Sequence, residues 1–186
     1  MMRLIELIFC FLVILLLSPL LILIAILIKC ETKGPIIFLT ERVGFNNIVF
    51  KMPKFRTMYL NTEVVETSKL RDPKKKITKI GKILRKYSLD ELPQFISVIF
   101  GKMSIIGPRP ALSSQIKLIQ KRKDYGIHLF KPGITGYAQV NGRDNLNMDE
   151  KVFLEFEYLN NKSFLTDFLI LIKTIKIIFK NKDISH

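Results

Sequence analysis

The feature that most constrains this chain is a long apolar run near its N-terminus. Residues 7–28 are 22 consecutive residues without a charge. A straight helix of that length would be about 33 Å long, enough to cross the ~30 Å apolar core of a bilayer. The run is too long for the apolar part of a cleaved signal peptide, and no small-residue cleavage site follows it. We therefore expect residues 1–33 to form a membrane-inserted unit and residues 34–186 a second domain.

Ser18 and Pro19 lie in the middle of this run. Proline removes a helical hydrogen bond and clashes with the preceding turn, so Pro19 predicts a kink or a break, and the Ser18 hydroxyl can satisfy part of the exposed backbone. The run could be a kinked helix that crosses once. It could also be a helix-break-helix hairpin that enters and leaves on one face, since neither arm alone spans the core. Arg3, Lys29 and Lys33 flank the run and favour a cytoplasmic position for both ends.

The net charge of +14 indicates an anionic partner, which could be nucleic acid, anionic lipid or a phosphorylated substrate. Residues 69–86 contain nine lysines and arginines and one acid, and their second half has apolar residues at helical spacing. Beside a membrane anchor, this pattern predicts a helix on anionic lipid headgroups. Residues 164–180 predict a second interfacial helix. We expect no nucleic-acid partner, because aromatic residues are not interleaved with the basic run.

The chain changes character after residue 34. Residues 35–39 and 48–51 read as short strands around a turn at 44–47, and residues 137–140 also look strand-like. Residues 95–100 are apolar but too short to span a membrane, so they belong to a core or an interface. The pattern predicts an α+β fold, mainly α with a small β-hairpin, in which amphipathic interfacial helices surround a compact domain next to the membrane unit.

Two adjacent carboxylates, Asp90 and Glu91, follow the basic segment. Ser88 and Glu91 have the spacing of a capping box, which would put both acids in the first turn of a helix. Alternatively, Pro93 is the first helical residue and the acids lie just outside. In both cases they are near a helix N-terminus, which favours ionised carboxylates and attracts phosphate. Such a pair can also hold Mg²⁺ together with substrate phosphates.

Two further segments present cations next to residues that restrict the backbone. Pro108 and Pro110 bracket Arg109 and limit it to extended conformations, which suits a guanidinium that binds phosphate in a bidentate manner. Lys54 and Arg56 flank an aromatic residue. These two could bind phosphate or belong to an ordinary edge strand, and the segment alone favours the edge strand.

The chain resembles the bacterial sugar transferases, the monotopic phosphoglycosyl transferase family, and in particular its small single-domain members. The resemblance covers nearly the whole chain and rests on five blocks in the same order: Ser18-Pro19, KFRTM at 54–58, SLDELPQ at 88–94, IGPRP at 106–110 and KPGITGYAQVNGR at 131–143. The chain has Glu6 where the family usually has aspartate. Pro53 stands where an aromatic residue is common, and tryptophan is frequent near the positions of Tyr137 and Met148.

The resemblance implies a two-step transfer at the cytosolic face of the bacterial inner membrane, with a re-entrant hairpin as the anchor. Asp90 would attack the β-phosphate of a UDP-sugar, expel UMP and carry the sugar-phosphate covalently. Polyprenol phosphate would then accept that group. Glu91 would help to hold Mg²⁺, with Asp90 as a second candidate ligand.

The resemblance also implies residues that bind the substrates. The candidates for phosphate binding are Lys54, Arg56, Arg85, Pro108 and Arg109. Further candidates for substrate contact are Gln139, Asn141 and Arg143. The sequence does not define the sugar, the polyprenol length, the pathway or the oligomeric state.

Overall fold

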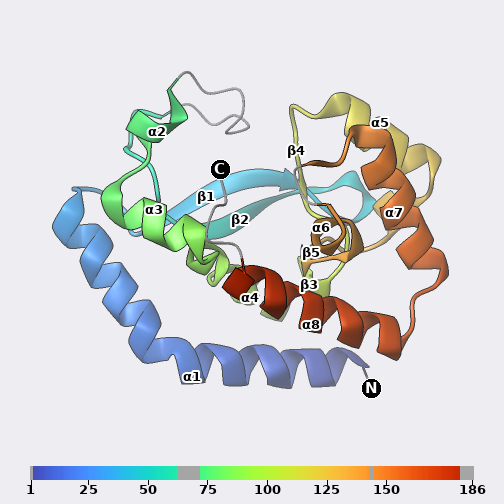
Figure 1. Ribbon diagram of the computed structural model, residues 1–186, viewed down its shortest axis with the longest axis horizontal. Helices are drawn as coiled ribbons and strands as arrows, with labels where there is room; N and C mark the ends of the chain where they lie inside the picture. Colours follow the sequence, from blue (N-terminus) through green and yellow to red (C-terminus); the bar gives the residue numbers. More distant parts are fainter. Residues whose placement is uncertain (1, 63–71, 143–144, 181–186) are drawn as a thin grey trace.

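The computed structural model describes residues 2–62, 72–142 and 145–180. Short helices and two small sheets lie on one side of a long N-terminal helix (Figure 1), so the predicted α+β class is confirmed. The elements are α1 (Met2–Glu31), β1 (Ile37–Val43), η1 (Phe45–Asn47), β2 (Val49–Phe55), α2 (Pro73–Lys76), α3 (Lys79–Lys86), η3 (Leu89–Glu91), α4 (Gln94–Ile99), β3 (Ser104–Ile106), β4 (Ala111–Leu112), α5 (Ile116–Asp124), η4 (Ile127–Leu129), β5 (Gly133–Thr135), α6 (Tyr137–Val140), α7 (Met148–Asn160) and α8 (Phe164–Lys180).

Helix α1 is continuous but bent. Pro19 lies inside it, and Figure 1 shows the change of direction near its middle. The Ser18 hydroxyl donates a 2.7 Å hydrogen bond to the Leu15 carbonyl, the group that Pro19 cannot bond. The predicted kink is therefore confirmed, without a complete interruption of the helix. Among the described residues, only Arg3–Glu31 is long and apolar enough to cross a membrane, and 11% of its most apolar window is buried in the protein.

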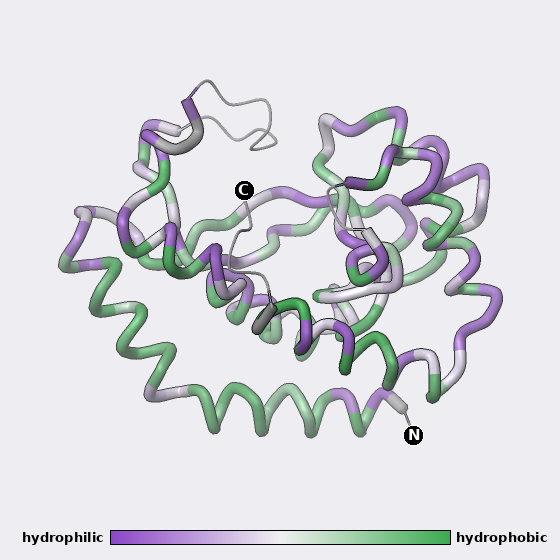
Figure 2. The backbone as a smooth tube through the Cα atoms, viewed as in Figure 1, coloured by the Kyte–Doolittle hydropathy of each residue, from purple (hydrophilic) through white to green (hydrophobic). Residues whose placement is uncertain are grey.

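Both arms of α1 pack against the rest of the molecule. Cys10 in the first arm is buried in a cluster with Met52 and Val98, and Ile24 in the second arm is buried in a cluster with Leu84. Figure 2 shows that most residues along both arms are hydrophobic. The large apolar side chains exposed on both arms are Leu4, Ile5, Ile8, Phe9, Phe11, Leu12, Leu15, Leu16, Ile22, Leu23, Ile26 and Leu27. Because this surface runs along both arms, it gives the molecule one continuous apolar side.

The predicted hairpin is confirmed and its strands are longer than expected. Strands β1 and β2 pair antiparallel from Ile37↔Phe55 to Val43↔Val49. Strand β4 pairs with the other side of β1, so β2 is an edge strand, as the KFRTM segment indicated. Asn46 and Asn47 take the positive φ values that close the turn.

The second sheet consists of β3 and β5, which run parallel. A side chain at Gly133 would place its Cβ 2.1 Å from the Gly107 amide nitrogen, so the approach of these segments requires glycine. The prediction that residues 137–140 form a strand is wrong. They form the four-residue helix α6, next to which Gln139 donates to the Ile134 carbonyl and Asn141 donates to the Tyr137 carbonyl.

The basic segment 69–86, for which the sequence predicts a helix on anionic lipid headgroups, packs part of its apolar face against α1. In its described part, Ile77 and Leu84 are buried, and Leu84 packs with Ile24 and Ile28 of α1. Helix α1 therefore covers part of this face, whereas Ile83 and Tyr87 are exposed, so contact of the segment with lipid headgroups stays a prediction. The predicted helix at residues 164–180 is confirmed as α8, with several large apolar side chains exposed.

Helices α5 and α7 are joined by a buried ion pair. Arg122 donates from Nε to one Glu155 oxygen at 2.8 Å and from Nη2 to the other at 2.5 Å. The side chains are 9% and 3% exposed. A buried pair with this bidentate geometry compensates two desolvated charges, so each partner depends on the other.

We predict that Arg122→Ala destabilises the protein by about 3–5 kcal/mol, because it leaves the Glu155 carboxylate buried and uncompensated. Thermal unfolding followed by circular dichroism in detergent would measure the loss. The double variant Arg122→Met/Glu155→Leu is the control and should unfold near the wild-type temperature, since no buried charge remains. Equal loss in both variants would contradict the ion-pair explanation.

Candidate functional site

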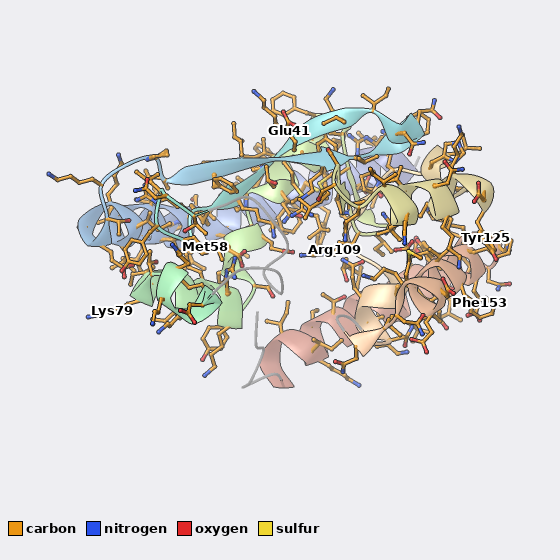
Figure 3. All side chains as sticks on the ribbon, turned by 90° about the horizontal axis from the view of Figure 1, so that it is seen from above. Glu41, Met58, Lys79, Arg109, Tyr125 and Phe153 are labelled. Carbon is orange, nitrogen blue, oxygen red and sulfur yellow. The ribbon has the colours of Figure 1, made fainter. Side chains whose placement is uncertain are left out.

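Elements that are distant in the sequence bring charged side chains together. Lys54 lies near the end of β2, Arg85 in α3, Asp90 and Glu91 in η3, and Arg109 in the loop between β3 and β4. Figure 3 shows Arg109 near the centre of the molecule, between the segment with α3 and the segment with α6 and α8. The structure thus groups the two predicted carboxylates with three of the predicted phosphate-binding cations.

The local structure of the carboxylates differs from the predicted capping box. Ser88 has φ 54° and its side chain caps no helix, while Asp90 and Glu91 form a short 3₁₀ turn. Helix α4 begins at Gln94, immediately after Pro93. Of the two predicted arrangements, the structure is therefore closer to the one in which both acids lie just before a helix that starts near Pro93.

Glu91 is held by two cations. Lys54 Nζ lies 2.6 Å and Arg109 Nη2 2.9 Å from the same oxygen, Oε1. Oε2 has a longer contact, 3.5 Å from Arg109 Nη1. Burial acts to raise the pKa of Glu91, but the charges and hydrogen bonds of Arg109 and Lys54 outweigh it and hold that pKa well below its ordinary value. Glu91 is therefore ionised and fixed in place.

Asp90 has a different environment. It is 8% exposed, and its closest cation is Lys54, 3.8 Å from Oδ2. Among the described residues, no hydrogen bond engages its carboxylate. Burial raises the pKa of Asp90, the charge of Lys54 acts against this rise, and the neighbouring Glu91 carboxylate adds to it. Asp90 is thus the less encumbered of the two acids.

Arg85 is oriented by a residue that the sequence reasoning did not single out. Its Nε donates to the Thr57 hydroxyl at 3.0 Å, while its Nη1 is buried without a hydrogen-bond partner among the described residues. Burial lowers the pKa of Arg85, and the carboxylates of Asp90 and Glu91 act in the opposite direction. The position of Thr57 inside the KFRTM block was the only sequence signal for it.

Several other predicted site residues are not brought to the carboxylates. The guanidinium of Arg56 binds carbonyls of Thr32 and Lys33 at the end of α1. Gln139 bonds the backbone of β5, and Asn141 accepts a hydrogen bond from Lys173 of α8 at 2.9 Å.

Pro108 lies beside Arg109, and its carbonyl accepts from the Gly133 amide at 2.9 Å. Its described role is thus to hold the Arg109 loop against β5. Arg143 lies outside the described residues.

The residues present fit a hard divalent cation that shares its coordination with substrate. The described residues contain no group of three or more histidine, cysteine, aspartate or glutamate side chains that could hold a metal by themselves. Mg²⁺ commonly takes one or two carboxylates and completes its shell with substrate phosphates and water. Asp90 and Oε2 of Glu91 are the oxygens with only long contacts here, so this pair is a suitable donor set.

Comparison with known proteins agrees with these blocks. The bacterial sugar transferase profile matches residues 1–181. The UDP-N-acetylgalactosamine-undecaprenyl-phosphate N-acetylgalactosaminephosphotransferase of Aeromonas hydrophila is 39% identical over 166 residues, covering 87% of this chain and 39% of that protein. The UDP-glucose:undecaprenyl-phosphate glucose-1-phosphate transferase of Escherichia coli is 42% identical over 180 residues, covering 92% and 38%.

A relative of more similar length is the exopolysaccharide production protein ExoY of Sinorhizobium fredii, 37% identical over 175 residues, covering 86% of this chain and 76% of that protein. The chain spans about two fifths of the length of the two named phosphotransferases. The profile nevertheless includes α1, the carboxylate pair and the Arg109 loop. The chain therefore belongs to the bacterial sugar transferase family.

Proposed function

We propose that this protein transfers a sugar-1-phosphate from a UDP-sugar to polyprenol phosphate and releases UMP, as a first membrane step of glycan assembly. The observation that carries the proposal is the unequal environment of two adjacent carboxylates: Glu91 is bound by Lys54 and Arg109, whereas no described residue hydrogen-bonds the Asp90 carboxylate. The names of the phosphotransferase relatives contain both a UDP-sugar and undecaprenyl phosphate, which supports the same substrate classes here.

The two environments support two roles. A nucleophile needs an ionised oxygen that is not occupied by other bonds. In the described part of the chain, no hydrogen bond occupies the Asp90 carboxylate, and the Lys54 charge at 3.8 Å opposes the burial that raises the pKa of Asp90. Glu91, ionised and fixed by two cations, instead orients Lys54 and Arg109 toward the space in front of Asp90.

In the first step, a carboxylate oxygen of Asp90 attacks the β-phosphorus of the UDP-sugar. The bond from this phosphorus to the oxygen that bridges the two phosphates breaks, and its electron pair leaves with UMP. In the second step, a phosphate oxygen of polyprenol phosphate attacks the same phosphorus. The bond to Asp90 breaks, the carboxylate is regenerated and a polyprenol diphosphate-sugar is formed.

The cations around the carboxylates stabilise the phosphate charges in both steps. Arg109 is 42% exposed at its side chain, so its guanidinium can reach substrate while still close to Glu91. Arg85 Nη1 is buried without a hydrogen-bond partner among the described residues, and the charges of Asp90 and Glu91 act on this guanidinium. Mg²⁺, held by Glu91 and Asp90, would neutralise the diphosphate and the departing UMP.

We also propose that α1 is a re-entrant anchor, with both ends and the catalytic domain on the cytosolic face of the bacterial inner membrane. Arg3 donates to the Val98 carbonyl at 2.6 Å, and Glu31 accepts from the Ile80 amide at 3.0 Å. The two ends of α1 therefore contact the same domain, a geometry that a helix crossing the bilayer would lose. The exposed apolar faces of both arms supply the lipid-facing surface.

Substitution of the carboxylates tests the two roles. We expect Asp90→Asn to abolish turnover and also the release of UMP from UDP-sugar alone, because no covalent intermediate can form. Glu91→Gln should keep weak activity that rises with added Mg²⁺. UMP release by purified protein, with UDP-glucose and UDP-N-acetylgalactosamine as donors, measures both effects.

The covalent intermediate can be located directly. After reaction with UDP-sugar alone, mass spectrometry should find a phospho-sugar adduct on the peptide that contains Asp90, with fragmentation assigning it to that residue. An adduct on Glu91 would reverse the roles. Absence of an adduct, together with kinetics that require both substrates bound at once, would refute the two-step mechanism.

Arg109→Lys tests whether the geometry of the guanidinium matters beyond its charge. Lysine keeps the charge but cannot contact Glu91 and a phosphate oxygen with one planar fork. We expect kcat/KM to fall roughly 10²-fold, the scale of losing one donor in a charge-stabilising site. Membrane association and the unfolding temperature should stay unchanged. Near-normal turnover would show that Arg109 serves only as a solvated charge.

Cysteine labelling in intact cells tests the topology. In a background with Cys10→Ala and Cys30→Ser, we expect Met2→Cys and Lys33→Cys to resist an impermeant reagent until the membrane is permeabilised. Ser18→Ala/Pro19→Leu should straighten α1 and expose Met2→Cys in part of the population. External labelling of Met2→Cys with Ser18 and Pro19 intact would mean that α1 crosses the bilayer.

A further inference from the structure

Arg56 joins the end of helix α1 to strand β2, which carries Lys54. It is 4% exposed, although it lies one residue beyond the end of β2. Its Nη1 donates to the Lys33 carbonyl at 3.0 Å, and its Nη2 donates to the Thr32 carbonyl at 2.8 Å and the Thr32 hydroxyl at 2.7 Å. Its own amide donates to the Ile36 carbonyl at 2.9 Å. All these partners lie where the chain leaves α1.

The backbone at Gly34 passes so close to the Arg56 guanidinium that no larger residue fits at this position. Gly34 has φ 120°, and a Cβ there would lie 2.3 Å from Arg56 Nη1. The chain can therefore pass over the guanidinium only with glycine at this position. Two residues before Arg56, Lys54 binds Glu91 at 2.6 Å. One short piece of backbone thus carries a contact to the carboxylates and a contact to the anchor.

Other polar contacts at the ends of α1 act on the same elements. Glu31 accepts from the amides of Lys79 and Ile80 at 2.5 and 3.0 Å, at the start of the helix that carries Arg85. At the opposite end, Arg3 binds the Val98 carbonyl of α4, and Glu6 accepts from the Ile105 amide of β3 at 2.7 Å. The membrane helix is therefore held at both ends to the elements that surround the carboxylates.

We propose that Arg56 is a positioning residue that fixes the height of the carboxylate pair above the bilayer, and that it serves the transfer to polyprenol phosphate rather than the reaction with UDP-sugar. This inference rests on the proposed function. The donor is soluble and can reach Asp90 at any height. The acceptor phosphate is fixed to a lipid, so it reaches the phosphorus on Asp90 only if the domain lies at one distance from the membrane surface.

The two half-reactions can be measured separately. Exchange of labelled UMP into UDP-sugar, without acceptor, reports the first. Transfer from the preformed adduct to polyprenol phosphate in phospholipid vesicles reports the second. The variants are Arg56→Lys, which keeps the charge but cannot bind both carbonyls with one fork, and Thr32→Val, which removes only the hydroxyl acceptor.

We expect Arg56→Lys to change UMP exchange by no more than about twofold. Transfer to vesicle-bound acceptor should fall about 10- to 100-fold, the scale of misplacing reacting groups by roughly 1 Å. A short-chain polyprenol phosphate dispersed in detergent should restore most of the loss, because that acceptor is not confined to a bilayer plane. Thr32→Val should show a smaller loss with the same pattern and remains available if Arg56→Lys does not fold.

Arg122→Ala is the matched control, a destabilised variant whose buried arginine is remote from α1 in sequence and binds Glu155. It should lower both half-reactions in proportion to the folded fraction. Loss of UMP exchange in Arg56→Lys would assign Arg56 to the donor phosphates and overturn the proposal. Equal losses in both half-reactions, or no loss in either, would also overturn it. Absence of UMP exchange in the wild-type protein would instead refute the proposed function itself.

Discussion

Two adjacent carboxylates taken out of water must be compensated by positive charge, and this requirement organises the centre of the molecule. Desolvation disfavours an ionised carboxylate, and a like charge beside it disfavours it further. Lys54, Arg85 and Arg109 supply the compensation from three different elements. The edge strand β2, helix α3 and the loop after β3 therefore meet at η3, where their cations oppose the effect of burial on both carboxylates.

The positive charge is distributed unequally between the two carboxylates, and this difference suits them to different chemical roles. Glu91 takes the short contacts with Lys54 and Arg109, so its charge is fixed and its position is defined. Asp90 stays buried with one long contact. An acid in that state keeps reactive oxygen lone pairs, and the cations held by its neighbour are already placed for an incoming phosphate. In the proposed two-step transfer, this preorganised charge would stabilise the phosphoryl group in each step.

The membrane helix is part of the same arrangement rather than an appendage. Cys10 and Ile24, one in each arm, are buried against the domain. The polar contacts at its ends reach α3, α4, β3 and the end of β2. This explains why Leu84, on a face of α3 that resembles a lipid-binding surface in sequence, is covered by α1. It also explains why Arg56, one of two cations in a block that resembles a phosphate site, is occupied with the anchor while Lys54 lies at the carboxylates.

The sequence by itself determined the features that depend on local pattern: the length of the apolar run, the kink at Pro19, the hairpin around residues 44–47, helix 164–180 and the pair Asp90–Glu91 as the candidate site. Covalent geometry, helical periodicity and turn chemistry suffice for these. Tertiary structure decided the partners. Lys54 and Arg56 are both cations of the same block, and the sequence alone does not distinguish them. In the structure, Lys54 meets Glu91 of η3 and Arg56 meets the end of α1, so the two side chains have different partners. Similarly, residues 137–140 look strand-like but form helix α6, where the Tyr137 ring stacks on Tyr158 of α7 and Lys173 of α8 donates to Asn141, contacts that local propensity does not encode.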